Sequence, residues 1–244
     1  MRVPAVAAVV LASGGGARLA SVLASVAWAG ERIVLDPAAR LTREPLPHGV
    51  RLHAGAAEPS ELTTAPWVLL LGDGEIASAD VPAAIATAVA EPGARPAYRI
   101  PVAVQGFGAT FRPPRAPIRL ARRSEARLRI GPGLAVDLDP SVGHAGQLRS
   151  ALIVRTTERL GEAVEHLDAQ ATTLAALLAE RRRRPRLWHL VLGPLAAGGH
   201  TLVARPVRQR ASARWFLAVL AGYRAAVAYA KLWERRRAES AERW

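Results

Sequence analysis

The sequence predicts an α/β fold in which helices flank a mostly parallel sheet, followed by a C-terminal helical extension. Over residues 1–96 short apolar runs alternate with helical patterns, which is typical of βαβ units and parallel strands. Residues 97–155 carry shorter strand patterns among prolines and arginines, and residues 156–244 are helical in pattern. We therefore expect an α/β domain over residues 1–155, divided near residue 96, and a helical region over residues 156–244.

The expected strands are short apolar runs bounded by glycine, proline or charged residues. They cover residues 3–11, 32–35, 50–53, 67–71, 98–104, 117–122 and 134–138. The run over 67–71 holds five apolar residues and ends abruptly in a Gly-Asp-Gly-Glu turn, so we expect it to be a central, fully buried strand. The first strand is followed by a glycine-rich loop and then by a helical pattern, which predicts the opening βαβ unit.

The expected helices have apolar residues three or four positions apart. They cover residues 18–29, 58–64, 78–90, 157–183, 187–203 and 212–237. Ser78 is expected to cap its helix, and Gly198 and Gly199 are expected to interrupt the helix over 187–203. The arginines at 181–184 lie at the C-terminal end of the longest of these helices, where positive charge interacts favourably with the helix dipole. Phosphate binding by these arginines is the alternative.

Composition narrows the classes of function. The formal net charge is +13 with a single lysine, Lys231, so the positive charge is nearly all arginine and favours anionic partners. Nucleic acid is not expected among them, because the few aromatic residues are not interleaved with the basic runs. The chain has no cysteine, which fits a reducing compartment and excludes a thiolate metal site or nucleophile.

Membrane-related patterns occur at both ends of the chain. The apolar start resembles a secretory signal, but its run stops at Ala12 before glycines and a helix, which favours a strand. The sequence has no run of 18 uncharged apolar residues, so a spanning helix is not expected. The terminal helix over 212–237 combines a broad apolar, aromatic face with a cationic strip, which favours binding in a membrane interface. Packing on its own domain is the alternative.

Acidic residues follow two of the expected strands. Asp73 and Glu75 lie directly after the strand over 67–71, and Asp36 ends the strand over 32–35. Ligands of open α/β sheets collect at the carboxyl ends of the strands, so all three are candidate binding residues. The same residues also suit turn chemistry, or, for Asp36 before Pro37, the start of a helix. Both interpretations remain open from the sequence.

Three stretches carry a family resemblance. They are LASVLASVAWAGERIVLD over residues 19–36, WVLLLGDGE over 67–75 and YAKLWERR over 229–236. Together they resemble the family 2 glycosyltransferases of the bacterial lipopolysaccharide-core and cell-envelope type, which have a GT-A fold, and the resemblance spans essentially the whole chain. It implies transfer of a sugar from a nucleotide-sugar donor to a lipopolysaccharide-core or other envelope glycan or glycolipid. It also implies a cytoplasmic protein, peripheral on the inner face of the cytoplasmic membrane.

The resemblance implies a role for each acidic residue. Residues 1–96 become a nucleotide-binding half and 97–155 an acceptor half, with Asp36 contacting the nucleoside. Asp73 and Glu75 lie near the diphosphate, where a divalent Mg or Mn ion would be the cofactor, and Asp137 is the candidate general base. The family's usual ligand positions fall on Gly72 and Gly74, which have no side-chain oxygen, and this difference argues against the metal.

Other family positions also differ. The family's first-loop Asn-Glu-Glu falls on glycines 14–16 of this chain. The family's histidine before the catalytic acid falls on Val136, and a later histidine of the family falls on Val154. Two interpretations therefore stay open: an active transferase, or a non-catalytic relative that acts as a scaffold or partner in envelope polysaccharide assembly. A third comes from LASGGGARL over residues 11–19, which resembles the glycine-rich loop of sugar nucleotidyltransferases.

Overall fold

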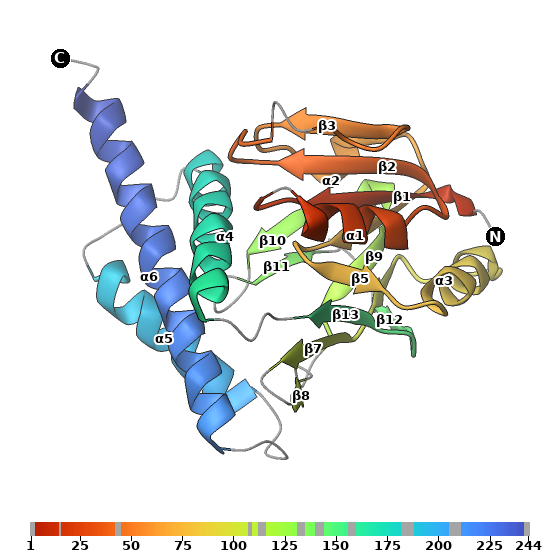
Figure 1. Ribbon diagram of the computed structural model, residues 1–244. Coiled ribbons are helices and arrows are strands. Elements are labelled where there is room, and N and C mark those ends of the chain that lie inside the picture. The colour runs from red at the N-terminus through yellow and green to blue at the C-terminus, as the bar shows by residue number, and fades with distance from the viewer. Residues whose placement is uncertain are drawn as a thin grey trace.

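The computed structural model has a mixed α/β architecture with a mostly parallel central sheet (Figure 1). It describes residues 3–14, 16–41, 45–106, 109–111, 116–130, 135–139, 144–155, 160–181, 188–204 and 211–241. Helices flank the sheet, and three further helices follow it, which confirms the predicted α/β class with a C-terminal helical extension.

The strands and helices have the following bounds. The strands are β1 Val3–Leu11, β2 Ala29–Asp36, β3 Val50–Ala54, β4 Trp67–Leu71, β5 Glu75–Ala77, β6 Ala97–Arg99, β7 Val102–Gly106, β8 Ala109–Phe111, β9 Ile118–Arg122, β10 Leu128–Ile130, β11 Val136–Leu138, β12 Gly146–Gln147 and β13 Leu152–Arg155. The helices are α1 Ala17–Ser25, α2 Pro59–Leu62, α3 Val81–Ala90, the 3₁₀ turn Arg123–Glu125, α4 Leu160–Glu180, α5 His189–Ala204 and α6 Ala211–Ala241.

The main sheet has the strand order β12-β6-β9-β4-β1-β2-β3. Strands β1 to β4 are mutually parallel, and β9 runs antiparallel between β4 and β6. The chain leaves β1 toward β2 and β3 and then returns to β4 on the other side of β1. This reversal is a topological switch point, and the carboxyl ends of β1 and β4 are where an open α/β sheet binds ligands.

Alternation along the central strands divides the core into two layers, because successive side chains of a strand point to opposite faces. Ala8, Val10 and Leu69 point to the face covered by α1 and α3. Val9 and Leu70 point to the opposite face, where α2, the β10–β11 hairpin and Leu177 of α4 pack. Residues 67–71 are all buried, as the apolar run predicted.

Several expected elements differ in the structure. The helix predicted over 18–29 ends at Ser25, because residues from Ala29 onward join β2 and pair with β1. The strand predicted over 98–104 is two strands: β6 belongs to the main sheet, and β7 to a separate sheet with β5, β8 and β13. The segment predicted as a helix over 58–64 forms a single turn, α2.

Other differences concern helix ends. Asp80, not Ser78, is the N-cap residue of α3, and the single hydroxyl proton of Ser78 has two acceptors within reach, Asp80 Oδ1 and the carbonyl of Ala151. Helix α5 continues through Gly198 and Gly199 without interruption. The ends predicted at residues 134, 157, 183 and 187, and the arginines at 182–184, lie outside the described residues.

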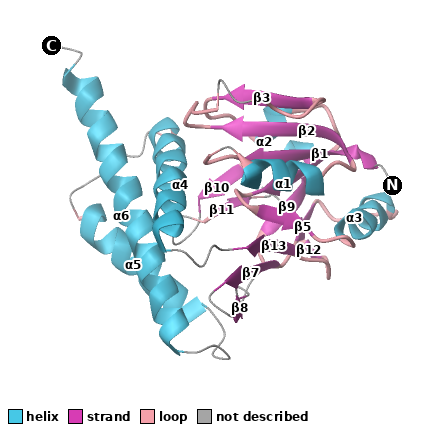
Figure 2. Cartoon of the chain, viewed as in Figure 1, coloured by secondary structure: helices cyan, strands magenta, loops and turns pink. Residues whose placement is uncertain are grey.

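The three C-terminal helices form a body of their own beside the sheet (Figure 2). Their shared core includes Leu174 and Leu178 of α4, Ala197 of α5, and Ala225 and Leu232 of α6. In Figure 1 this body lies on the side toward which the arrowheads of β2 and β3 point, so α4 faces the carboxyl edge of the sheet. None of the helices that the structure describes is long and apolar enough to cross a membrane.

Candidate functional site

The carboxyl ends of β1 and β4 meet at the loop after β1 and the turn after β4. The amide of Glu75 donates to the Gly72 carbonyl at 3.1 Å, and Gly74 has φ of 77°, a left-handed conformation that glycine adopts without strain. Ser13, two residues beyond β1, donates its hydroxyl proton to Asp73 Oδ2. The expectation that Asp73 lies at the carboxyl edge of the central strands is therefore met.

Asp73 also contacts a histidine that comes from the C-terminal helices. His166 of α4 places Nδ1 3.3 Å from Asp73 Oδ2, and its Nε2 lies 3.0 Å from Gln170 Nε2. Two turns beyond His166 on α4, the Thr173 hydroxyl donates to the Ala12 carbonyl at 3.3 Å. Helix α4 thus covers the edge of the sheet with polar side chains as well as with the apolar Leu177.

The charge around His166 is mostly positive. Its pKa lies below the ordinary value of 6.5, first because the side chain is buried and then because Arg18 and Arg224 are close, while Asp73 acts in the opposite direction. Arg18 is at the start of α1, and Arg224 of α6 places Nη1 3.5 Å from Gln170 Oε1. Two arginines from distant elements therefore lie near the same edge of the sheet.

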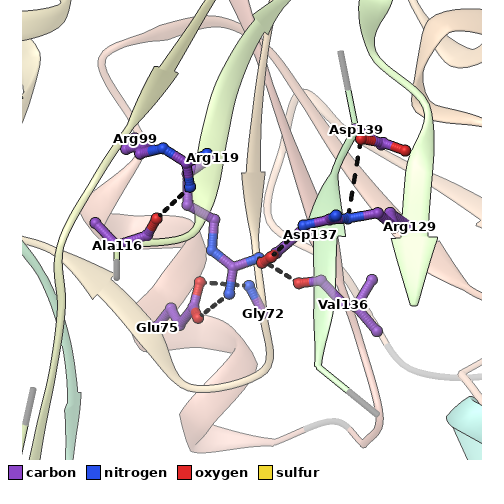
Figure 3. A network of polar contacts seen from close by, with 9 residues as sticks. All are labelled: Gly72, Glu75, Arg99, Ala116, Arg119, Arg129, Val136, Asp137 and Asp139. Atoms are coloured by element: carbon purple, nitrogen blue, oxygen red, sulfur yellow. Dashed lines mark hydrogen bonds and ion pairs between the residues drawn. The ribbon is translucent and has the colours of Figure 1, made fainter. Parts of the chain in front are cut away.

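Glu75 belongs to a second network, shown in Figure 3. Its side chain is buried; Oε1 lies 2.5 Å from Arg119 Nη2, and Oε2 accepts the Gly72 amide at 2.8 Å. Arg119 of β9 also donates Nη1 to the Val136 carbonyl at 2.6 Å and lies 3.7 Å from Asp137 Oδ1. Arg119 therefore lies between two carboxylates.

Asp137 is held from a second direction as well. Arg129 Nη2 lies 3.7 Å from Asp137 Oδ2, and the Asp137 side chain is 16% exposed. Burial raises the pKa of Asp137 above its ordinary value of 3.8, although Arg119 and Arg129 both favour the charged form. A carboxylate with a raised pKa and some access to solvent is chemically suited to accept a proton.

The arrangement does not fit a divalent metal ion on Asp73 and Glu75. Mg and Ca sites need several oxygen ligands converging on one point, whereas these two carboxylates turn to different partners, His166 and Arg119. A Cβ at position 72 would lie 3.2 Å from Glu75 Cδ, so the Glu75 carboxylate fills the space of a side chain there. Within the described ranges, no three His, Asp or Glu side chains are grouped to hold a metal.

Asp36 has its own local contact. The residue is buried, and its Oδ2 accepts the amide proton of Leu41 at 2.7 Å. A turn, not a helix, follows it at residues 37 and 38, so the alternative of a helix start is wrong. The Asp36 carboxylate therefore holds the loop after β2, and its contact with a nucleoside stays a prediction.

Several members of the site could not be recognised from the sequence, among them Ser13 and His166. Ser13 precedes three glycines in a loop, and His166 lies within a helical pattern dominated by its apolar stripe. The one available signal was the pair of polar residues His166 and Gln170, one turn apart on a helix. Arg122 of β9 pairs with Trp67 at the opposite end of β4, away from these acids.

Replacement of His166 is expected to change the acid stability of the fold. Because its folded-state pKa is lowered, the unfolded chain binds the proton more readily, so stability is full above about pH 6.5 and falls below it. A His166→Gln variant keeps a hydrogen-bonding side chain without that titration. Urea unfolding at pH 7.5 and 5.5 is expected to show a smaller loss for the variant than for the wild type; equal losses would remove His166 from the acid-sensitive groups.

Comparison with known proteins leaves the family open. No protein-family model and no curated protein matches the chain. Among solved structures it is similar to residues 1–349 of TarS from S. aureus, a glycosyltransferase, with a TM-score of 0.36 and 10% identity over 98% of this chain and 92% of that one. A likeness at this TM-score carries no argument about the function of this chain.

Proposed function

We propose that the chain is a glycosyltransferase-like protein that binds the diphosphate of a nucleotide sugar at the carboxyl ends of β1 and β4 without a divalent metal. The observation that carries the proposal is the meeting of the loop after β1 and the turn after β4 at the switch point of the sheet, through Ser13 and Asp73. Ligands of open α/β sheets bind at such points.

Positive charge at this edge supports diphosphate binding. A leaving diphosphate must be neutralised, commonly by a metal ion held on carboxylates, and two glycines at the family's ligand positions supply no side-chain oxygen ligand. Arg18 and Arg224 lie near His166 at the same edge. We assign the neutralising role to these arginines, whose guanidinium groups match phosphate geometry.

The register of the second sheet supports the family alignment on which the finer roles depend. Val154, where the family has a histidine, pairs directly with Glu75 across β13 and β5. Asp137, where the family has its catalytic acid, reaches the same Arg119 as Glu75. Val154, Glu75 and Asp137, which were matched to the family by sequence motif alone, thus lie close together. We assign Asp137 the role of general base. The proposed acceptor is an envelope glycan such as the lipopolysaccharide core.

A second candidate is a non-catalytic relative that binds partners in envelope polysaccharide assembly. One observation favours it: Asp73 and Glu75 are both engaged by partners within the chain, and α4 packs over the edge where the ligand would lie. Under this alternative the protein has no transfer activity. Release of UDP or GDP from nucleotide-sugar donors separates the two, because only an active transferase produces it.

Binding of UDP or GDP tests the proposal directly. Isothermal titration is expected to give the same affinity in EDTA as in Mn²⁺, and Arg18→Gln is expected to weaken binding about tenfold, the size of one lost charged hydrogen bond. Arg122→Gln is the matched control, since it removes the same charge at the other end of β4. Binding that requires Mn²⁺ would contradict the metal-free site. If neither UDP nor GDP binds, the proposal is overturned.

A further inference from the structure

Large apolar side chains are exposed on the C-terminal helices. Among the described residues every exposed large hydrophobic side chain belongs to α5, α6 or their flanks, apart from Leu160 of α4. Trp188 directly precedes α5, and Val191, Leu192 and Leu195 lie on it; these four side chains are 50–66% exposed. On α6 the exposed residues are Trp215, Val219, Tyr223 and Trp233. Apolar surface gathered in one region in this way marks a contact with a partner or a membrane.

The exposed residues form stripes along the helices. Trp188, Val191, Leu192 and Leu195 are spaced three and four positions apart, so they share one face of α5. Trp215, Val219 and Tyr223 recur every fourth position on α6. These stripes are not used in the core that α5 and α6 form with α4, which contains mainly alanine and leucine.

Small residues hold α5 and α6 together. A Cβ at Gly198 would lie 3.1 Å from the Ala218 carbonyl oxygen, and one at Gly222 would lie 3.2 Å from the Pro194 carbonyl oxygen. The pairing of 198 with 218 and of 194 with 222 makes the two helices an antiparallel hairpin. Small residues inside and large apolar residues outside are the arrangement by which helices pack when their outer surface meets lipid.

The charge of the chain favours a lipid surface over a second copy of the chain as the partner of these exposed apolar side chains. Trp233 is followed on α6 by Arg235, Arg236 and Arg237, and the Arg237 guanidinium lies 5.3 Å from the Trp233 ring centroid. Two copies of a chain with a net charge of +13 repel each other, whereas an anionic lipid surface attracts such a chain. Aromatic rings and arginines side by side suit the headgroup layer.

We propose that the α5–α6 hairpin is a peripheral anchor for anionic lipid, in which the outward stripe of α5 and the aromatic rings of α6 enter the headgroup layer. The sequence pattern predicted this role for the terminal helix alone; the structure adds Trp188, Val191, Leu192 and Leu195 of α5. The proposal does not depend on nucleotide binding, and its test uses no nucleotide.

Co-sedimentation of the full chain with vesicles tests the anchor. We expect binding to phosphatidylcholine mixed with phosphatidylglycerol, weakened by salt, and little binding to phosphatidylcholine alone. Leu192→Glu is expected to lower partitioning about tenfold, the loss that follows from keeping one leucine side chain out of the apolar layer. Leu160→Glu is the matched control, because Leu160 is 54% exposed, against 52% for Leu192, and lies on α4 outside both stripes.

A second variant and a second measurement keep the test decisive. Val219→Glu on α6 is expected to act like Leu192→Glu, and circular dichroism checks that both variants keep the helical content of the wild type. Equal effects of Leu192→Glu and Leu160→Glu would show a response to net charge alone and would overturn the proposal. A dimer in light scattering that Leu192→Glu dissociates, without vesicle binding by the wild type, would overturn it in favour of a second copy of the chain.

Discussion

Replacing Arg119 with methionine is expected to destabilise the fold by about 3–5 kcal/mol, the range for removing one partner of a buried ion pair. The side chains of Arg119 and Glu75 are 9% and 8% exposed, so the variant leaves Glu75, and in part Asp137, as uncompensated buried charges. Urea unfolding at pH 7.5 measures the loss. Adding Glu75→Gln to Arg119→Met is expected to restore part of the stability, because it removes the charge left behind.

An exposed ion pair of almost the same length provides the control. Arg51 Nη2 lies 2.6 Å from Glu31 Oε2, but these side chains are 60% and 31% exposed. Arg51→Met is expected to cost less than about 1 kcal/mol, because water screens an exposed pair. Similar losses for Arg51→Met and Arg119→Met would contradict the role of burial at Arg119.

Replacing Asp137 with asparagine is expected to lower sugar transfer by about 10²–10⁴-fold, the usual contribution of a general base. Asparagine keeps the size of the side chain and its place beside Arg119 but accepts no proton. Release of UDP or GDP from nucleotide-sugar donors, with lipopolysaccharide-core acceptors, measures the effect. The wild-type rate is expected to rise with pH as Asp137 loses its proton, at a pH above the ordinary carboxyl value of 3.8, because its pKa is raised.

Asp139 supplies the control for this prediction. It lies two residues further along, is 54% exposed, and contacts the same Arg129 at 3.9 Å, so Asp139→Asn changes the same charge outside the buried network. We expect it to keep wild-type activity. Full activity of Asp137→Asn would exclude Asp137 as the base. A wild type that binds nucleotide but releases none from any donor would favour the non-catalytic alternative.

Part of the fold could be predicted from local sequence patterns. The buried run over 67–71 and the alternation of strands with helices over residues 3–36 depend on neighbouring residues, and the structure confirms both. The strand over 98–104 was predicted as one element because its apolar residues continue through Pro101. Pro101 has no amide proton to donate to a sheet, and the chain divides there between two sheets.

Only part of the candidate site could be predicted from the sequence. Asp73 and Glu75 were recognised because they follow a strand, but their partners were not, since Arg119 is 44 residues from Glu75 and Ser13 is 60 residues from Asp73. Helical periodicity likewise predicted the apolar face of α6 without indicating which part of it meets α5. Spacing along the chain carries no information about which distant element packs against a given face.

The sequence alone determined the opening strand–helix–strand unit, the buried strand over 67–71, the acids at the carboxyl edge of the sheet and the net charge, because these follow from composition and from local periodicity. Only the tertiary structure decided that Asp73 turns to His166 and Glu75 to Arg119. It also decided that small residues face inward between α5 and α6. The physical reason is that buried charges and close helix contacts are satisfied by whichever groups the packed fold brings within reach.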